Sequence, residues 1–363
     1  MNSAVARAAP NGIVWVDDLN DAALPRAGSK MARLGELRRH GVKVPDGFVI
    51  ATDVFERFLA SSAAGRTVEA CMSRLRDADD AEAIASVSKE ARAAIEAEPI
   101  PAEIAEAIVD AYEEHSYRRR DLNPPVAVRS SATGEDAADA SFAGLFDTYL
   151  GVTGPQRVLV AVRQCWGSLF TERAVGYRLR KGLDYRLSPM AVGVLELVHA
   201  RASGVAFSIH PVSGSTQRMV IEGSWGWGEA VVQGMVQPDH IEIGKSDRRV
   251  LDYQVADKRV VSCFDYARGL VVEHDMPKRL RTEKILDDEQ IAAIVETVLA
   301  IEACYGYAVD TEWVIDRHRR PGEPITIVQT RPVTGKPIED KEVPRWDPVA
   351  YAAKYAFGGK NHS

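Results

Sequence analysis

From about residue 190 the sequence becomes a series of short Val- and Ile-rich runs separated by Gly, Pro, Asp and Ser, and this change constrains the fold most. Runs of this length and composition predict β-strands. Residues 66–118, in contrast, are rich in Ala, Glu, Arg and Asp with helical periodicity, which predicts a helical subdomain with solvated charged faces. An α-rich front followed by a β-rich rear indicates an α+β protein. The rear runs are MAVGVLELV, GVAFSIHPV, RMVIEGSW, HIEIG, RVLDYQV and RVVSCF.

The same change sets the predicted boundaries. Residues 1–189 form a front portion that contains the helical insert, and residues 190–335 form a rear portion. A helix around 287–304 and two strands, DTEWVID and ITIVQTR, close the rear portion. Residues 336–363 have the composition of a linker and a tail.

Composition and charge exclude several classes of protein. The 363 residues are 46% hydrophobic and 27% charged, with a net charge of −7, which argues against broad binding to nucleic acid or anionic membranes. The four cysteines form no CxxC pair, so neither a disulfide framework nor a zinc site is expected. The N-terminus lacks the apolar segment of a signal peptide and no stretch is long enough to span a membrane, so a cytoplasmic location is expected.

The usual nucleotide-binding loops are missing: no GxxxxGK[ST] occurs, and no GxGxxG follows a predicted strand. Five other stretches carry candidate chemistry. In the first, AGSKMARLGEL, Gly28 and Ser29 would let the backbone approach a phosphate at a helix start, where Lys30 adds a charge. The alternative is a solvated lysine on a surface helix.

The second stretch, VAVRSSATGEDAADASFAG, places Arg129 at the end of an apolar strand. A guanidinium there can make forked contacts with phosphate oxygens. The alternative is a salt bridge from Arg129 to Glu135 or Asp136 in a surface loop. Hydroxyls and unobstructed amides for the same ligand would come from Ser130, Ser131, Thr133, Gly134 and Gly144.

The third and fourth stretches, ASGVAFSIHPVSG and IEGSWGWGEAVVQGMVQPDH, are mixtures of core and candidate site. The third is expected to be mostly core. In the fourth, Trp225 and Trp227 are expected to pack, and Glu222 or Glu229 is a candidate contact to a substrate or to backbone.

The fifth stretch joins DTEWVID to IVQTRPVT. Strand alternation puts Glu312 on the face opposite Thr311 and Trp313, and gives Gln329 and Arg331 a shared face. A carboxylate and an amide oxygen on neighbouring strands are hard ligands suited to Mg²⁺, which takes one or two protein carboxylates and completes its shell with water and phosphate. Arg331 would then meet the phosphate charge. The alternative is a cross-strand ion pair between Glu312 and Arg331.

Taken in order, these stretches resemble the ATP-binding portion of the phosphoenolpyruvate synthase and pyruvate phosphate dikinase family, which has an ATP-grasp fold. The family pattern is roughly GGKGxNLGEL, VRSSAxxEDxxxxSFAG, SGVAFTxxP, SWGLGE, and DIEW followed by LQxRP. The resemblance covers about residues 25–335. The matching residues run from 28 to 36, 128 to 144, 203 to 207, 224 to 229, 310 to 313 and 328 to 332.

The resemblance implies that ATP lies between the two portions, with Lys30 and Arg129 on the phosphates and Thr148 close to them. It implies that Glu312 and Gln329 ligate Mg²⁺ and that Arg331 steadies the transferring group. Phosphoryl transfer of this kind depends on positioning and charge neutralisation, so no nucleophile is expected in this chain. The further nucleotide contacts carried over or considered are Ser130, Gly144, Glu196 and Glu222.

Two positions depart from the family pattern. The glutamine expected near the adenine is Leu195, and the neighbouring Glu196 is a candidate to take over part of its role. Ser29 replaces the second glycine of GGKG. In addition, family members pass phosphate through a histidine in a GGxxSHxA-like setting, and none of the eight histidines has that setting, His210 and His240 included.

The resemblance therefore implies a partner subunit that carries the phosphohistidine. By its length the chain is most similar to the stand-alone ATP-binding subunit of phenylphosphate synthase, in which ATP is cleaved to AMP and phosphate and the β-phosphoryl group reaches phenol. Three alternatives stay open. The chain could be the front part of a phosphoenolpyruvate synthase, the front part of a rifampicin phosphotransferase-like enzyme, or a non-catalytic subunit that binds nucleotide.

Overall fold

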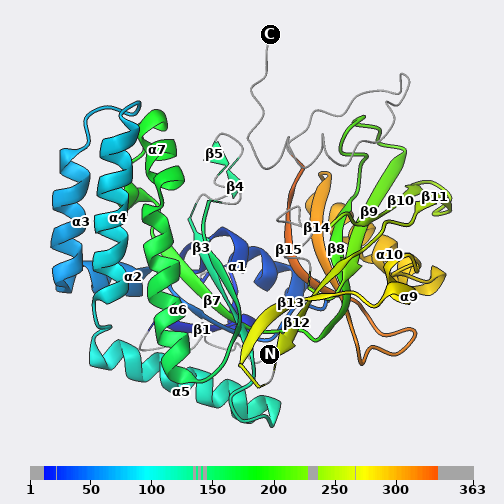
Figure 1. Cartoon of the computed structure of the whole chain (residues 1–363), viewed down its shortest axis with the longest axis horizontal. Coiled ribbons are helices and arrows are strands. Elements are labelled where there is room, and N and C mark those ends of the chain that lie inside the picture. Colours follow the sequence, from blue (N-terminus) through cyan, green and yellow to red (C-terminus); the bar gives the residue numbers. More distant parts are fainter. Residues whose placement is uncertain are drawn as a thin grey trace, which may run out of the picture. The chain divides into compact units, whose positions relative to one another are not determined.

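The computed structural model describes residues 12–21, 23–133, 136–137, 140–141, 145–227, 236–265 and 267–333. Helices and sheets are mixed along the chain, which confirms the predicted α+β class (Figure 1). The described residues divide into two compact units, one containing most of those up to residue 197 and the other most of those from residue 198 onward. Each unit is considered separately below.

The first unit is built on a five-stranded antiparallel sheet in the order β1-β2-β7-β3-β6. The predicted front portion ends at residue 189, but the strand that follows, β7, lies between β2 and β3 in this sheet. The division at 189/190 stays a prediction. The strands are β1 (Ile13–Trp15), β2 (Gly47–Ile50), β7 (Met190–Glu196), β3 (Val126–Ala132) and β6 (Thr148–Val152).

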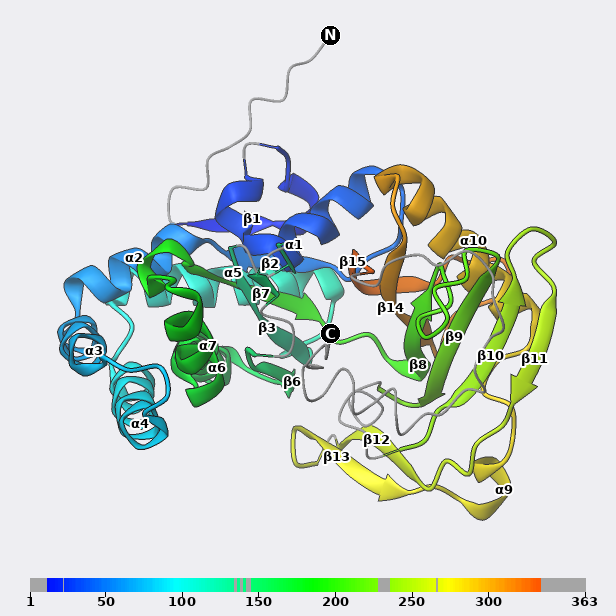
Figure 2. The same ribbon diagram turned by 90° about the horizontal axis from the view of Figure 1, so that it is seen from above.

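Helices flank this sheet, and the predicted helical insert contains most of three of them. Figure 2 looks along the axes of two members of this group, α3 and α4. The helices of the first unit are α1 (Leu24–Arg39), α2 (Thr52–Ser61), α3 (Ala63–Arg74), α4 (Ala81–Ala97), α5 (Ala102–Arg119), α6 (Pro155–Gly167) and α7 (Glu172–Lys181). The 3-10 turns are η1 (Val16–Asp18), η2 (Ser168–Phe170) and η3 (Tyr185–Leu187).

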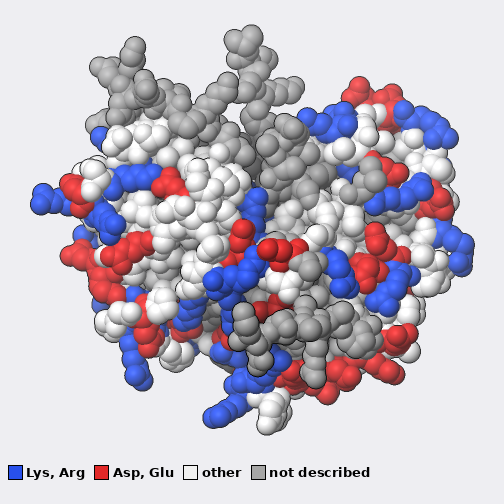
Figure 3. All heavy atoms as spheres, turned by 180° about the vertical axis from the view of Figure 1, so that it is seen from behind, with Lys and Arg blue, Asp and Glu red and all other residues white. Residues whose placement is uncertain are grey.

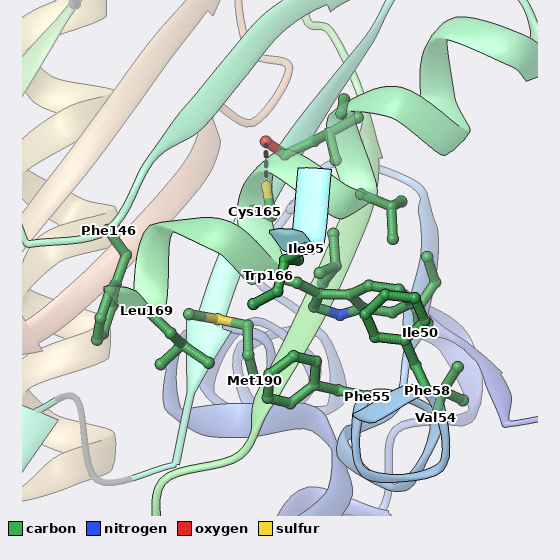
Figure 4. Close-up of a cluster of buried hydrophobic side chains, with 14 of the residues drawn as sticks. Ile50, Val54, Phe55, Phe58, Ile95, Phe146, Cys165, Trp166, Leu169 and Met190 are labelled. Atoms are coloured by element: carbon green, nitrogen blue, oxygen red, sulfur yellow. Dashed lines mark hydrogen bonds between the residues drawn. The ribbon is translucent and has the colours of Figure 1, made fainter. Parts of the chain in front are cut away.

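One face of the first sheet packs on α2, α6 and other helices of this unit and forms the main core, whereas α1 lies against the opposite face. Phe58 of α2 stacks on Trp166 of α6 with ring centroids 4.8 Å apart, and Phe55 lies beside them (Figure 4). From the sheet, the core receives every second side chain of β3 and β7, including Val128 and Val192. Stacked aromatic pairs of this kind stabilise a core beyond their area of contact.

The second unit is built on a six-stranded antiparallel sheet in the order β11-β10-β9-β8-β14-β15, beside a two-stranded sheet of β12 and β13. The six strands are β8 (Ala200–Phe207), β9 (Arg218–Trp225), β10 (Asp239–Gly244), β11 (Val250–Gln254), β14 (Val309–Asp316) and β15 (Thr326–Pro332). The remaining elements of this unit are β12 (Val260–Asp265), β13 (Leu270–Asp275), α9 (Lys278–Arg281) and α10 (Asp288–Tyr305). Two further strands belong to the first unit, where β4 (Asp136–Ala137) and β5 (Ala140–Ser141) form a short ladder.

Helix α10 covers one face of the six-stranded sheet. It starts at a capping box made by Asp287 and Gln290, and it contacts β14 and β8. On this face Trp313 is fully buried against Gly223, where any Cβ would lie 2.7 Å from its ring. Asp239 is buried beside it and accepts hydrogen bonds from Lys258 and Tyr253. This face of the sheet is therefore filled by packed and hydrogen-bonded side chains.

On the face seen in Figure 3, Lys and Arg side chains are interspersed with Asp and Glu side chains. In the part of the chain that the structure describes, no helix is both long enough and apolar enough to cross a membrane.

Candidate functional site

In the first unit the start of the lysine-bearing helix is attached to β3 by close backbone contact. Gly28 interrupts α1 with φ 68° and ψ 169°, a conformation that favours glycine. A Cβ at this position would lie 1.8 Å from the carbonyl oxygen of Ser131. The Ser131 hydroxyl donates to the Ala27 carbonyl at 2.9 Å and accepts from the Met31 amide at 3.1 Å. The helix segment that begins with Ser29 and Lys30 is therefore held against the end of β3.

Arg129 lies on the same face of the first sheet as this helix start. In the strand register Arg129 is opposite Thr148 of β6 and Gly193 of β7, and directly paired residues share a face. Gly193 lies against Met31 of α1, because a Cβ there would be 2.2 Å from the Met31 sulfur. The structure thus places Arg129, Ser131 and Thr148 on the face that carries the helix start with Lys30.

Ser130 has a different orientation from its neighbours. It alternates with Arg129 along β3 and shares a face with Val128 and Ala132, which belong to the main core. Ser130 is fully buried, and its hydroxyl has no hydrogen-bond partner among the described residues. A ligand on the Arg129 face cannot reach this hydroxyl, because the sheet lies between them. Of the adjacent serines, Ser131 supplies the polar side chain on the candidate face.

Glu196 lies on the face opposite Leu195. The Leu195 side chain is buried on the face that carries Gly193, whereas Glu196 is opposite Val126. The Glu196 carboxylate forms an ion pair with Arg119 at the end of α5, and its amide donates to the Asp46 carbonyl at 2.7 Å. The position that the family pattern assigns to glutamine is therefore apolar here. Glu196 does not replace it on the same face.

In the second unit the predicted strand alternation is confirmed. Glu312 of β14 is opposite Gln329 of β15, and Asp310 is opposite Arg331, so all four share one face. Thr311 and Thr330 lie on the other face, buried, with their hydroxyl oxygens 3.2 Å apart. The register shifts after Glu312, where Trp313 is opposite Ile327.

The ion pair on this face differs from the alternative considered from sequence. Arg331 approaches Asp310 through both Nε and Nη2, each 2.7 Å from the same carboxylate oxygen. Asp310 is nearly buried, so it can fix the direction of the guanidinium. Sequence reasoning did not single out Asp310. Its spacing of two residues from Glu312 was the available signal, since alternation places both on one face.

The same face continues across the sheet to two further polar residues. Glu312 is opposite Val205 of β8, Val205 is opposite Glu222 of β9, and Glu222 is opposite His240 of β10. Glu222 is 4% exposed and His240 3% exposed. His240 Nδ1 lies 3.1 Å from Glu222 Oε1. One row of cross-strand neighbours therefore runs from Gln329 to His240.

Comparison with known protein families assigns the chain to a family. Residues 24–347 match the model of the pyruvate phosphate dikinase AMP/ATP-binding domain. The chain belongs to this family. The family resemblance expected from the five motifs is thereby confirmed, and the matched range includes both units.

Several curated relatives of this dikinase-family chain are longer enzymes. It is 37% identical over 333 residues to a probable phosphoenolpyruvate synthase of Methanothermobacter thermautotrophicus, covering 91% of this chain and 47% of the relative. It is 38% identical over 330 residues to a probable phosphoenolpyruvate synthase of Archaeoglobus fulgidus, covering 91% and 42%. It is 38% identical over 323 residues to a rifampicin phosphotransferase of a Streptomyces species, covering 89% and 36%. The chain thus spans less than half the length of these relatives.

The donor set of this dikinase-family domain suits a magnesium ion. Glu312 and Gln329 supply a carboxylate and an amide oxygen from directly opposed positions, and both are hard oxygen donors. Among the residues that the structure describes, no three His, Cys, Asp or Glu side chains gather into a metal cluster. Magnesium bound with a nucleotide does not require such a cluster, because water and phosphate oxygens complete its shell.

Some predicted site residues lie outside the described residues. They are Gly134, Glu135, Gly144 and Glu229.

Proposed function

We propose that this chain binds ATP and carries out the ATP-dependent half of an AMP-forming phosphoryl transfer. The observation that carries the proposal is a set of two cross-strand pairs in the second unit, Glu312 with Gln329 and Asp310 with Arg331. Glu312 with Gln329 offers oxygen ligands, and Arg331, oriented by Asp310, offers a positive charge on the same face. Phosphoryl transfer needs this combination of metal ligands and fixed charge more than it needs a nucleophile.

The first unit would supply the remaining charges. Arg129 and the helix start with Lys30 are held on one face by the contacts of Gly28 and Ser131. Both residues are positively charged and suit phosphate oxygens, with Thr148 on the same face as Arg129. Glu222 would contact the nucleotide away from its phosphates, because a carboxylate repels them. Magnesium bound by Glu312 and Gln329 would neutralise phosphate charge.

The β-phosphoryl group would pass to a histidine that is not in this 363-residue sequence, since none of its eight histidines lies in a GGxxSHxA-like setting. We propose that this histidine belongs to a partner subunit. We propose phenol as the final acceptor, with phenylphosphate as the product, on the basis of the resemblance to the ATP-binding subunit of phenylphosphate synthase.

The comparisons favour a second candidate. The relatives named above are two probable phosphoenolpyruvate synthases and a rifampicin phosphotransferase, so pyruvate or rifampicin is the alternative acceptor. The ATP-dependent half of the reaction would be the same in each case. The acceptor depends on parts outside this sequence.

Transfer of label from ATP tests the proposal. The protein is mixed with the products of neighbouring genes, ATP labelled at the β-phosphate, and phenol, pyruvate or rifampicin. Label on a partner histidine and then on phenol supports the lead candidate, and label on pyruvate or rifampicin supports the second. Nucleotide binding without transfer to any partner would instead indicate a non-catalytic subunit.

A further inference from the structure

His240 and Glu222 form a buried polar contact that the proposed transfer reaction leaves unexplained. His240 Nδ1 lies 3.1 Å from Glu222 Oε1, and both side chains are at least 95% buried. Because an ionised carboxylate only accepts hydrogen bonds, a hydrogen bond to it requires the tautomer of His240 that carries its hydrogen on Nδ1. The contact uses one carboxylate oxygen, Oε1, and leaves Oε2 available for a different donor.

The far side of the His240 ring faces a second carboxylate. His240 Nε2 lies 3.8 Å from Glu242 Oε1, and Arg218 Nη1 contacts Glu242 Oε2 at 2.7 Å. Glu242 is two residues from His240 on the same strand and therefore on the same face. Arg218 therefore pairs with Glu242, Glu242 lies beside the His240 ring, and His240 contacts Glu222 through Nδ1. The ring is thus bracketed by two carboxylates.

His210 provides a natural comparison because its ring lies beside the same carboxylate, that of Glu242. Its Nε2 also lies 3.8 Å from Glu242 Oε1, and it is as deeply buried as His240. Its Nδ1 accepts hydrogen bonds from the amides of Val212 and Ser213 at 3.3 and 3.2 Å. His210 therefore fastens a turn, whereas His240 is directed at Glu222.

The position of the Glu222–His240 pair on the sheet suggests its function. Glu222 lies in the same cross-strand row as Glu312 and Gln329, separated from Glu312 by Val205 alone. A buried carboxylate that approaches a nucleotide must be held in one direction, since its own burial is costly unless it is hydrogen-bonded. His240 supplies that hydrogen bond from the side away from Glu312.

We propose that His240 is a positioning residue, which orients the Glu222 carboxylate to accept a hydrogen bond from the base or sugar of the bound nucleotide. This inference rests on the proposed ATP-binding function. His240 does not touch the nucleotide itself. Its effect is transmitted entirely through Glu222.

The test compares variants in equilibrium binding of the imido analogue of ATP with Mg²⁺, by calorimetry on the full chain. His240→Leu removes the donor, and His240→Asn restores an N–H near the position of Nδ1. We expect His240→Leu to weaken binding about tenfold, the loss typical of one hydrogen bond to a charged group. His240→Asn should stay within about threefold of the wild type because the hydrogen bond is retained.

A double variant separates positioning from a general structural role. In the Glu222→Gln background, His240→Leu should cause little further loss, because the group that it orients has already been changed. His210→Leu is the matched control and should lower the melting temperature without a comparable loss of binding. Melting curves of each variant show whether it is folded.

The results that would overturn the inference are distinct from failure of the proposed function. Wild-type affinity in folded His240→Leu, or additive losses in the double variant, would overturn the role of His240 while leaving ATP binding intact. If the wild type fails to bind the analogue, or Lys30→Ala and Arg129→Ala bind it normally, the proposed function itself is wrong. The positioning role would then be rejected with it.

Discussion

Single side chains in this protein acquire their roles from the face of the strand on which they lie. Arg129 and Ser130 are adjacent in β3, yet Arg129 shares a face with Thr148 while Ser130 lies in the main core. In β14, Glu312 faces Gln329 while Thr311 is buried on the other side against Thr330. At the residue scale, the candidate chemistry therefore belongs to alternate positions.

Arg129→Ala and Lys30→Ala should each abolish most phosphoryl transfer. We expect a fall of about 100- to 1,000-fold, the usual effect of removing one fixed charge or donor from a transferring group. Transfer of β-labelled phosphate to the partner measures it. Ser130→Ala is the control and should retain transfer, because its hydroxyl faces the core. Normal transfer in either charge variant would refute the site.

Glu312→Gln should raise the magnesium concentration needed for half-maximal transfer by about tenfold or more, an effect of the size seen when the supporting groups of metal sites are changed. The reason is the loss of the carboxylate opposite Gln329. A magnesium titration of the transfer rate measures the change. Glu289→Gln, which alters a carboxylate paired with Arg319 in the same unit, should leave the titration unchanged. Equal magnesium dependence in both variants would exclude Glu312 as a ligand.

His115 of α5 should make the protein less stable in mild acid. Burial lowers the pKa of His115 from 6.5 to about 4, with the nearby Arg119 charge adding to the effect. The unfolded chain therefore takes up a proton below pH 6.5 that the folded chain does not accept until about pH 4. Stability is present in full above pH 6.5 and is lost as the pH falls through this window.

Urea unfolding between pH 7 and pH 4 measures this loss. Over this range the free energy of unfolding of the wild type should fall by on the order of 2 to 3 kcal/mol more than that of His115→Leu, because the variant has no group to protonate at this position. Parallel curves for the two proteins would show that His115 is not a source of acid sensitivity.

Among the elements, helix α1 shows how one backbone contact sets the position of a candidate site. The helix is interrupted at Gly28, and its continuation is fastened to β3 by Ser131, which bonds on both sides of the interruption. The glycine is required here because the backbone approaches the Ser131 carbonyl too closely for a side chain. Ser29 in place of the family's second glycine does not disturb this contact.

Gly28→Ala should destabilise the first unit more than Gly182→Ala. Both glycines have positive φ, 68° and 65°, but a Cβ at Gly182 meets nothing within 4 Å. Gly182→Ala should lower the free energy of unfolding by about 1 to 2 kcal/mol because of the backbone conformation alone. Gly28→Ala should cost roughly 1 to 3 kcal/mol more, because the new methyl group would collide with β3. Equal losses in thermal or urea unfolding would contradict the close contact.

At the scale of the whole molecule, the chain forms two compact units whose boundaries do not follow the change in sequence texture. Met190, Val192 and Val194 of β7 belong to the core of the first unit, although they stand at the start of the β-rich part of the sequence. Within its sheet β7 is paired on both sides, with β2 and with β3. Removing it would separate β2 from β3 and leave each of them paired on one side only.

A fragment of residues 1–200 should therefore retain more structure than a fragment of residues 1–189. The longer fragment keeps β7 and its three core side chains, whereas the shorter loses a central strand. Circular dichroism and the cooperativity of urea unfolding distinguish the two. Equally cooperative unfolding of both fragments would show that β7 is not essential to this unit.

Much of this protein could be predicted from its sequence by itself. The ordered motifs indicated the family, and the succession of helix-like and strand-like segments indicated the α+β class. Side-chain alternation along β14 placed Glu312 and Thr311 on opposite faces of the sheet. These are local properties, because secondary structure and side-chain direction depend on neighbours along the chain.

Only the tertiary structure decided which residues meet. The Asp310–Arg331 pair, the row from Gln329 through Glu222 to His240, and the place of β7 all depend on strand register. Register is set by the packing of whole strands that are far apart in sequence, and a shift of one residue would reverse every face. The sequence by itself therefore identified the candidate site residues of this protein, and long-range strand pairing determined which of them lie together.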